Sequence, residues 1–142
     1  MPALTLALAN RIISASLAKA RSDGLKPLTI AVLDPGGHLI ALQREDGSSN
    51  LRPAIAVAKA NGALGLGISS RAIGAIAVER PTFLASLHAL APSGLVPAAG
   101  GVIVQALDGA LCGAVGVTGD SSDHDELCAL AGIAEAGLIA QP

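Results

Sequence analysis

LTIAVLDPGGHLIALQ, residues 28–43, is the stretch that decides the fold class. Two short apolar runs, 28–33 and 38–43, flank the tetrapeptide DPGG. Both runs have the length of a strand, and the first contains β-branched residues. Pro35 presets one φ angle of the turn, and a glycine supplies the positive φ that a tight reversal needs. Strands joined by so short a turn pair antiparallel, so the stretch predicts a β-hairpin.

A second hairpin is predicted near the end of the chain. GVIVQA, 101–106, reads as a strand, LDG, 107–109, as a turn, and ALCGAVGVT, 110–118, as a longer strand. Gly113 and Gly116 lie inside this last strand. Glycine within a strand often marks a place where another backbone comes very close, so we expect such a contact here.

The first predicted helix covers residues 5–23. Leu8, Ile12 and Leu17 recur there at helical spacing and indicate one apolar face. Thr5 is the expected N-terminal cap, and Gly24 is expected to end the helix. Further helices are predicted at 51–66, about 70–79, and about 122–139, and the segment 82–100 is predicted to be a loop region with one helical turn near 83–90.

These elements give the order α-β-β-α-α-β-β-α within a single domain, residues 1–142. The predicted fold class is α+β, an antiparallel β-sheet flanked by helices. No internal repeat or linker interrupts the chain.

Composition limits the kinds of partner. Apolar residues make up 51% of the chain and charged residues only 14%, and Phe83 is the sole aromatic residue. A surplus of apolar surface predicts a homo-oligomer, in which subunit contacts hide it. The net charge of −2 and the lack of aromatic side chains argue against nucleic-acid binding.

Neither a membrane segment nor a signal peptide is expected. Residues 81–107 carry no Asp, Glu, Lys or Arg, but prolines and glycines divide them into short elements. Arg11 follows the N-terminal apolar run instead of preceding it. Cys112 and Cys128 each lie in apolar sequence, which predicts two buried free thiols and a reducing, cytoplasmic location.

Several motifs together resemble the GlcG/HbpS family of haem-binding or "haem-degrading domain" proteins, and also the C-terminal domain of PduO. The motifs are DPGGHLIALQREDG at 34–47, KA at 59–60, GG at 100–101, DG at 108–109, GAVGVTG at 113–119 and DHDE at 123–126. The resemblance spans nearly the whole chain.

The resemblance implies a profilin-like α+β fold and a homo-oligomer assembled from dimers, up to an octamer. It also implies haem as a cofactor, since members of this family are associated with haem binding and with small-molecule roles. The predicted first helix contains no histidine, whereas some haem-binding relatives place a ligand there, and the segment 81–99 departs from the family pattern.

The stretch GVTGDSSDHDEL, 116–127, supports more than one interpretation. Ser121 or Ser122 could cap a helix whose first turn holds acids, where the helix dipole favours negative charge. A self-contained metal site is disfavoured, because adjacent residues such as Asp123 and His124 point in different directions. Alternatively, the strand end at Thr118 and Gly119 borders a ligand pocket at the helix N-terminus.

Isolated polar residues provide the remaining candidates. Lys59 stands alone in AIAVAKANGALGLG, so it either extends to solvent or pairs with an acid such as Asp125 or with a substrate carboxylate. Arg44 either forms a local salt bridge with Asp46 or clamps a ligand carboxylate. His38 is either an exposed strand-end histidine or an acid/base group or haem iron ligand.

Three functions stay open at this point. The first is an oligomer that binds a small molecule. Haem is the molecule that the resemblance names, and His38 is the candidate residue to coordinate its iron. The second is a cofactor-independent enzyme that transfers protons on a small carbonyl or hydroxy-acid compound. Its working groups would be Lys59, Asp125 and Glu126, and Arg44 would hold a substrate carboxylate. The third is an accessory subunit without chemistry.

Overall fold

The computed structural model describes residues 4–141, and it places both predicted hairpins in one antiparallel sheet. The five strands are β1 (Thr29–Leu33), β2 (Leu39–Arg44), β3 (Gly101–Gln105), β4 (Leu111–Thr118) and β5 (Ile139–Ala140). Their order across the sheet is β2-β1-β4-β3-β5. The two hairpins meet where β1 pairs with β4 at the centre. The predicted α+β class is confirmed.

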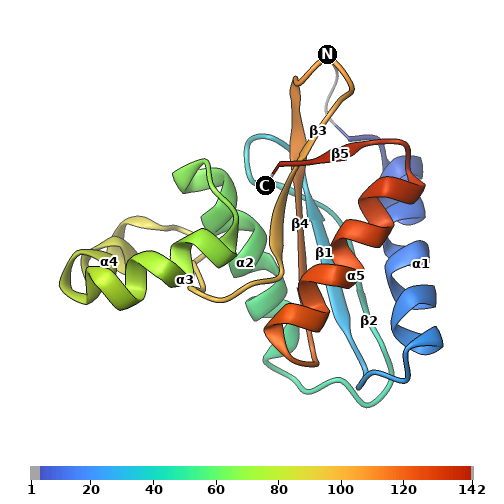
Figure 1. Cartoon of the computed structure of the whole chain (residues 1–142), viewed down its shortest axis with the longest axis horizontal. Coiled ribbons are helices and arrows are strands. Elements are labelled where there is room, and N and C mark those ends of the chain that lie inside the picture. The colour runs from blue at the N-terminus through green and yellow to red at the C-terminus, as the bar shows by residue number, and fades with distance from the viewer. Residues whose placement is uncertain (1–3, 142) are drawn as a thin grey trace.

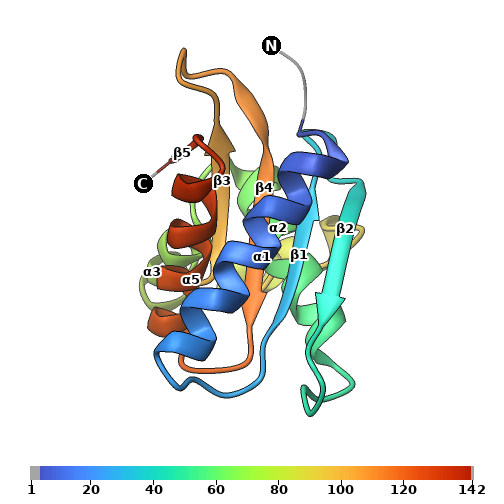
Figure 2. The same cartoon turned by 90° about the vertical axis from the view of Figure 1, so that its right-hand side faces the viewer.

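Helices cover both faces of this sheet, as Figures 1 and 2 show. They are α1 (Leu6–Ser22), α2 (Arg52–Leu66), α3 (Ser70–Glu79), α4 (Pro81–Leu87) and α5 (Ser122–Glu135). Helices α1 and α5 lie side by side on one face, and α2 packs on the other. Helices α3 and α4 extend away from the sheet beyond α2. We call α3, α4 and the following 3-10 turn η1 (His88–Leu90) the arm.

Two predicted elements were wrong in their extent. The helical turn predicted near 83–90, within the loop region 82–100, is longer in the structure: α4 and η1 together span 81–90. Pro81 both follows α3 and occupies the first turn of α4, where its missing N–H costs nothing. The last helix ends at Glu135, not near 139, and Gly137 then turns the chain with a φ of 75°. The chain continues as β5, which pairs with β3, so the order of elements gains a helix and a final strand.

The main core lies between the α1–α5 layer and the sheet. It consists of Ile, Val, Leu and Ala side chains together with Cys112 and Cys128. Both cysteines are buried and free, as predicted. Burial raises the pKa of the Cys128 thiol to about 11, so this thiol stays protonated at neutral pH. Among residues 4–141, no helix is both long enough and apolar enough to cross a membrane.

Helix α2 packs so tightly on the sheet that two strand positions must be glycine. A β-carbon on Gly116 would overlap the carbonyl oxygen of Ala56, and one on Gly101 would overlap that of Lys59. The close contact expected at Gly116 is therefore confirmed, and the approaching backbone is that of α2. This contact fixes where the side chains of α2 reach the sheet.

Candidate functional site

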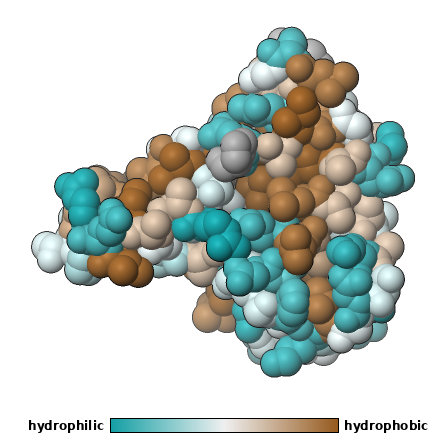
Figure 3. Space-filling view, viewed as in Figure 1, coloured by the Kyte–Doolittle hydropathy of each residue, from teal (hydrophilic) through white to brown (hydrophobic). Residues whose placement is uncertain are grey.

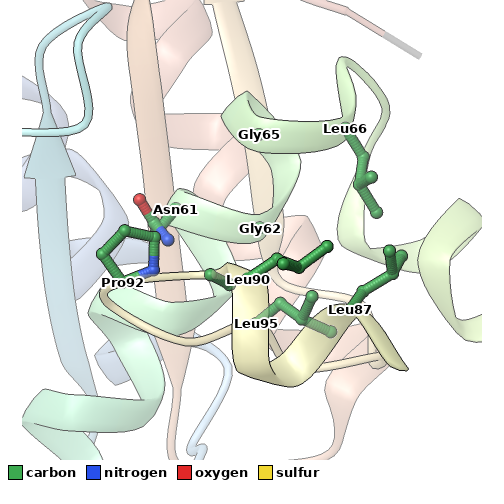
Figure 4. A pocket seen from close by; sticks show the side chains of 9 residues that line it. Asn61, Gly62, Gly65, Leu66, Leu87, Leu90, Pro92 and Leu95 are labelled. Carbon is green, nitrogen blue, oxygen red and sulfur yellow. The ribbon is translucent and has the colours of Figure 1, made fainter. Parts of the chain in front are cut away.

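An apolar groove lies between α2 and the α4–η1 part of the arm (Figure 4). Its volume is about 300 Å³, at the lower end of the range for small-molecule sites. The side chains that line it are mostly aliphatic, and they include Leu66, Leu87, Leu90 and Leu95. Asn61 is the polar side chain of the lining, and its amide donates a hydrogen bond to the Gly94 carbonyl (2.9 Å). The groove therefore offers an apolar wall with one polar end.

The β1–β2 turn touches this polar end of the groove. A β-carbon on Gly37 would lie 3.1 Å from Oδ1 of Asn61. His38 follows directly, and its side chain is 81% exposed. Its Nδ1 lies 3.2 Å and 3.3 Å from the two carboxylate oxygens of Asp34. The turn that borders the groove therefore also carries His38, whose ring contacts Asp34.

Lys59 and Asp125 form a buried ion pair near the end of the sheet that is opposite to the β1–β2 turn. Nζ of Lys59 lies 3.3 Å from Oδ2 of Asp125 and donates to the Val117 carbonyl (2.9 Å). Oδ1 of Asp125 accepts from the backbone N–H of Asp120 (3.0 Å). The side chains are only 3% and 1% exposed. Lys59 therefore does not extend to solvent, and it pairs with an acid, one of the arrangements expected from the sequence.

Burial moves the pKa values of this pair in opposite directions. Loss of hydration lowers the pKa of Lys59, and the charge of Asp125 opposes that shift. Burial likewise raises the pKa of Asp125, against the bond from the Asp120 N–H and the charge of Lys59. Both shifts reflect the cost of keeping the charged forms away from water. A substrate would reach these groups only if the start of α5 moved.

The other predicted ligand residues lie on the same side as this pair, away from His38. The Thr118 hydroxyl is buried and accepts from Nη1 of Arg52 (2.6 Å). Gly119 follows it and is half-buried. Arg44 donates to Oδ1 of Asn50 (3.1 Å). Within residues 4–141 it forms no salt bridge with Asp46, so the first of its two predicted roles is wrong.

His38 directly precedes β2, and Arg44 is its last residue. That strand has six residues, so it separates them by about 20 Å, at a rise of about 3.3 Å per residue. The predicted ligand-binding residues therefore form two groups and not one site. One group consists of His38 only, and the groove lies next to it. The other group consists of Arg44, Thr118 and Gly119.

The acidic segment begins α5, as the capping interpretation predicted. Ser121 is the N-cap, and its hydroxyl accepts from the His124 N–H (3.2 Å). Glu126, one of the predicted working groups, instead forms an ion pair with Arg71 of α3 (3.1 Å), which also pairs with Asp123. Within residues 4–141, no three His, Cys, Asp or Glu side chains gather closely enough to hold a metal ion.

Sequence reasoning missed the groove and the residues that define its polar end. Asn61 lies two residues after Lys59 in an apolar stretch, and nothing local marks it as exposed to a cavity. Leu87 and Leu90 fall where a single helical turn was predicted, and Leu95 falls in the predicted loop. Asp34 gave a usable signal, because an aspartate opening a tight turn often bonds to backbone N–H groups further on.

A single antiparallel sheet with helices on both faces, and a groove between α2 and the arm, places residues 4–141 in the α+β class. The chain belongs to the haem-degrading protein HbpS-like family, whose model matches residues 4–134. Among curated proteins, no sequence matches this chain.

Solved structures support this assignment. A double mutant of HbpS from Streptomyces reticuli is 30% identical, with a TM-score of 0.79 over 93% of this chain and 86% of that one. ORFY from Klebsiella pneumoniae is 25% identical, with a TM-score of 0.85 over 96% and 92% of the two chains. PduOC, solved as a haem complex, is 20% identical, with a TM-score of 0.86 over 99% of each chain, and it shows the shared fold.

Proposed function

We propose that this protein binds haem, or a related tetrapyrrole, in the groove between α2 and the arm. The observation that carries the proposal is the apolar groove next to the turn that presents His38. A porphyrin is a flat apolar ring, and its iron takes an axial imidazole readily. Family membership and the haem complex of PduOC support the same ligand.

The groove residues fit one side of such a ligand. Leu66, Leu87 and Leu95 supply aliphatic contact for a macrocycle, a role for which aromatic walls are not required. Asn61 offers a polar group at the end nearest the turn. Because the groove is about 300 Å³, part of a tetrapyrrole would extend beyond it toward His38 or solvent.

Titration with haemin tests this function. We expect a sharp Soret shift that saturates at a fixed stoichiometric ratio, and a clear loss of affinity in His38→Ala. Gly65→Leu should also block binding, because Gly65 lines the groove and has nothing within 4 Å of its missing β-carbon. His88→Ala is the matched control, since His88 is exposed on η1 and does not line the groove. An unsaturable, weak spectral change would contradict the proposal.

A second candidate is proton transfer by the Lys59–Asp125 pair, with Glu126 and Arg44 as further groups. The buried contact between the two side chains favours it, since burial lowers the pKa of Lys59 and so makes its proton easier to lose. The test is a bell-shaped pH–rate profile on small hydroxy acids that disappears in Asp125→Asn. If neither haemin nor any such compound gives a response, the accessory-subunit hypothesis is favoured.

We also propose that the chain assembles as a homo-oligomer through the arm. Val78 and Leu90 are 83% and 75% exposed, and Phe83 is 40% exposed with Arg80 stacked 4.1 Å from its ring centre. Figure 3 shows apolar surface on the arm as well as on the body. Large exposed aliphatic side chains on a projecting element favour burial against another subunit.

A further inference from the structure

The turn that carries His38 is organised around one carboxylate. Oδ1 of Asp34 accepts hydrogen bonds from the backbone N–H groups of Gly36 and His38, both at 2.9 Å. The Asp34 N–H in turn donates to the His38 carbonyl (2.9 Å). An aspartate is ordinarily ionised at neutral pH, and these two backbone N–H donors stabilise the charged form further.

The same carboxylate also contacts the ring of His38. Nδ1 lies 3.2 Å from Oδ1 and 3.3 Å from Oδ2, so this ring nitrogen faces the turn. An ionised carboxylate only accepts hydrogen bonds. In the neutral imidazole, contact with Asp34 therefore favours a proton on Nδ1 and leaves the lone pair on Nε2.

Gly36 provides space for this ring. A β-carbon at Gly36 would lie 2.9 Å from Cε1 and 3.0 Å from Nδ1 of His38, closer than side chains normally approach. The φ angle of Gly36 is not positive, so the backbone itself would accept another residue. Glycine at this position therefore matters for the position of the imidazole and not for the turn.

We infer that Asp34 and Gly36 are positioning residues that hold His38 with Nε2 free to bind iron. This inference rests on the proposed function, because it names the ligating atom and the groups that orient it. Carboxylates that accept a hydrogen bond from a ligating histidine fix its tautomer and raise its basicity. An exposed histidine held in this way loses less freedom on binding than a mobile one.

Two measurements test the inference. The first follows the ring nitrogens of His38 by ¹⁵N NMR in the ligand-free protein, at a pH where the ring is neutral. We expect the wild type to carry the proton on Nδ1. In Asp34→Asn the new amide would donate to Nδ1, so we expect the proton to move to Nε2. A wild-type ring with its proton on Nε2 would overturn the inference.

The second measurement is the haemin dissociation constant. Asp34→Asn and Gly36→Ala should each raise it about 10- to 100-fold, the usual effect of losing a group that orients a metal ligand. Asp108→Asn is the matched control, because Asp108 also caps a hairpin turn, bonding the Ala110 N–H (3.0 Å), and its carboxylate forms no hydrogen bond with a histidine. Equal affinity in wild type and Asp34→Asn would overturn the inference.

The two measurements separate this inference from the proposed function. If the wild-type ring carries its proton on Nδ1 and Asp34→Asn moves it, the positioning role stands even where haemin fails to bind. In that case the proposed function alone is wrong. If haemin binds to the wild type and both variants with the same affinity, the function stands and the positioning role is wrong.

Discussion

Lys59 and Asp125 are 66 residues apart in the sequence, yet Nζ of one lies 3.3 Å from a carboxylate oxygen of the other in the interior. The pair joins α2 to the start of α5, and the Val117 carbonyl of β4 accepts a bond from the same ammonium group. A helix on one face of the sheet is thereby connected to a helix on the other.

Removing one partner of this pair should strongly destabilise the fold. Lys59→Met leaves a buried, unpaired carboxylate, and such changes typically cost about 3–5 kcal/mol in the free energy of unfolding. In the double variant Lys59→Met/Asp125→Asn no charge remains, and the amide oxygen still accepts from the Asp120 N–H, so much of the loss should be recovered. Urea unfolding at one protein concentration measures both. Additive losses in the double variant would contradict the expected coupling.

Acid stability should depend on Asp120. N–H groups of Lys26 and Ser121 and the ring of His124 hold the pKa of this carboxyl below its usual value of 3.8. The unfolded chain then takes up a proton more readily than the folded one. The stability from these bonds is fully present above about pH 3.8 and is lost as the pH falls toward the lower folded pKa.

Asp120→Asn should therefore flatten the fall in melting temperature as the pH drops below about 3.8, and calorimetry across that range measures it. The control is again Asp108→Asn, because the Asp108 carboxylate accepts only a local bond from the Ala110 N–H. A wild-type curve as flat as that of Asp120→Asn would mean that these bonds do not act on the pKa.

The strands and helix caps were predictable because local features determine them. The sequences around Pro35 and Asp108 each indicate a tight turn. Thr5 and Ser121 are residue types that cap helices well, and both are N-caps in the structure. Strand β5 was not predictable. It has two residues, and only pairing with β3 and the bond from the Gln141 N–H to the Ile103 carbonyl make it a strand.

The candidate site was likewise predictable from the sequence only in part. The charge and apolar setting of Lys59 suggested an acidic partner, and Asp125 was named as one. The sequence could not show that both groups are closed off from solvent, because their burial depends on how α2 packs over Gly101. The groove depends on the distance between α2 and the arm, which no local pattern of residues 81–99 determines.

Gly116 should tolerate no side chain. A β-carbon there would overlap the Ala56 carbonyl, so Gly116→Ala must push α2 off the sheet, at a cost of about 1–3 kcal/mol or more. Gly65→Ala is the matched control within α2, since its β-carbon would meet nothing within 4 Å and alanine favours helix by about 0.5–1 kcal/mol. Denaturant unfolding should give opposite signs for the two. Equal stability in both variants would contradict the close packing.

The arm should mediate assembly, and Val78 is the side chain to test. It is 83% exposed, so Val78→Glu removes little packing within one chain and should leave the unfolding of a single subunit nearly unchanged. A buried, unpaired glutamate in a subunit contact is costly, so the variant should dissociate.

Native mass spectrometry and sedimentation measure the change in mass. Leu107→Glu is the matched control, because Leu107 is 79% exposed but lies in the turn between β3 and β4. If Leu107→Glu dissociates the homo-oligomer and Val78→Glu does not, the subunit contact lies at the β3–β4 turn, and its assignment to the arm is wrong. If the wild type is a monomer at all concentrations, the exposed aliphatic side chains of the arm have another role.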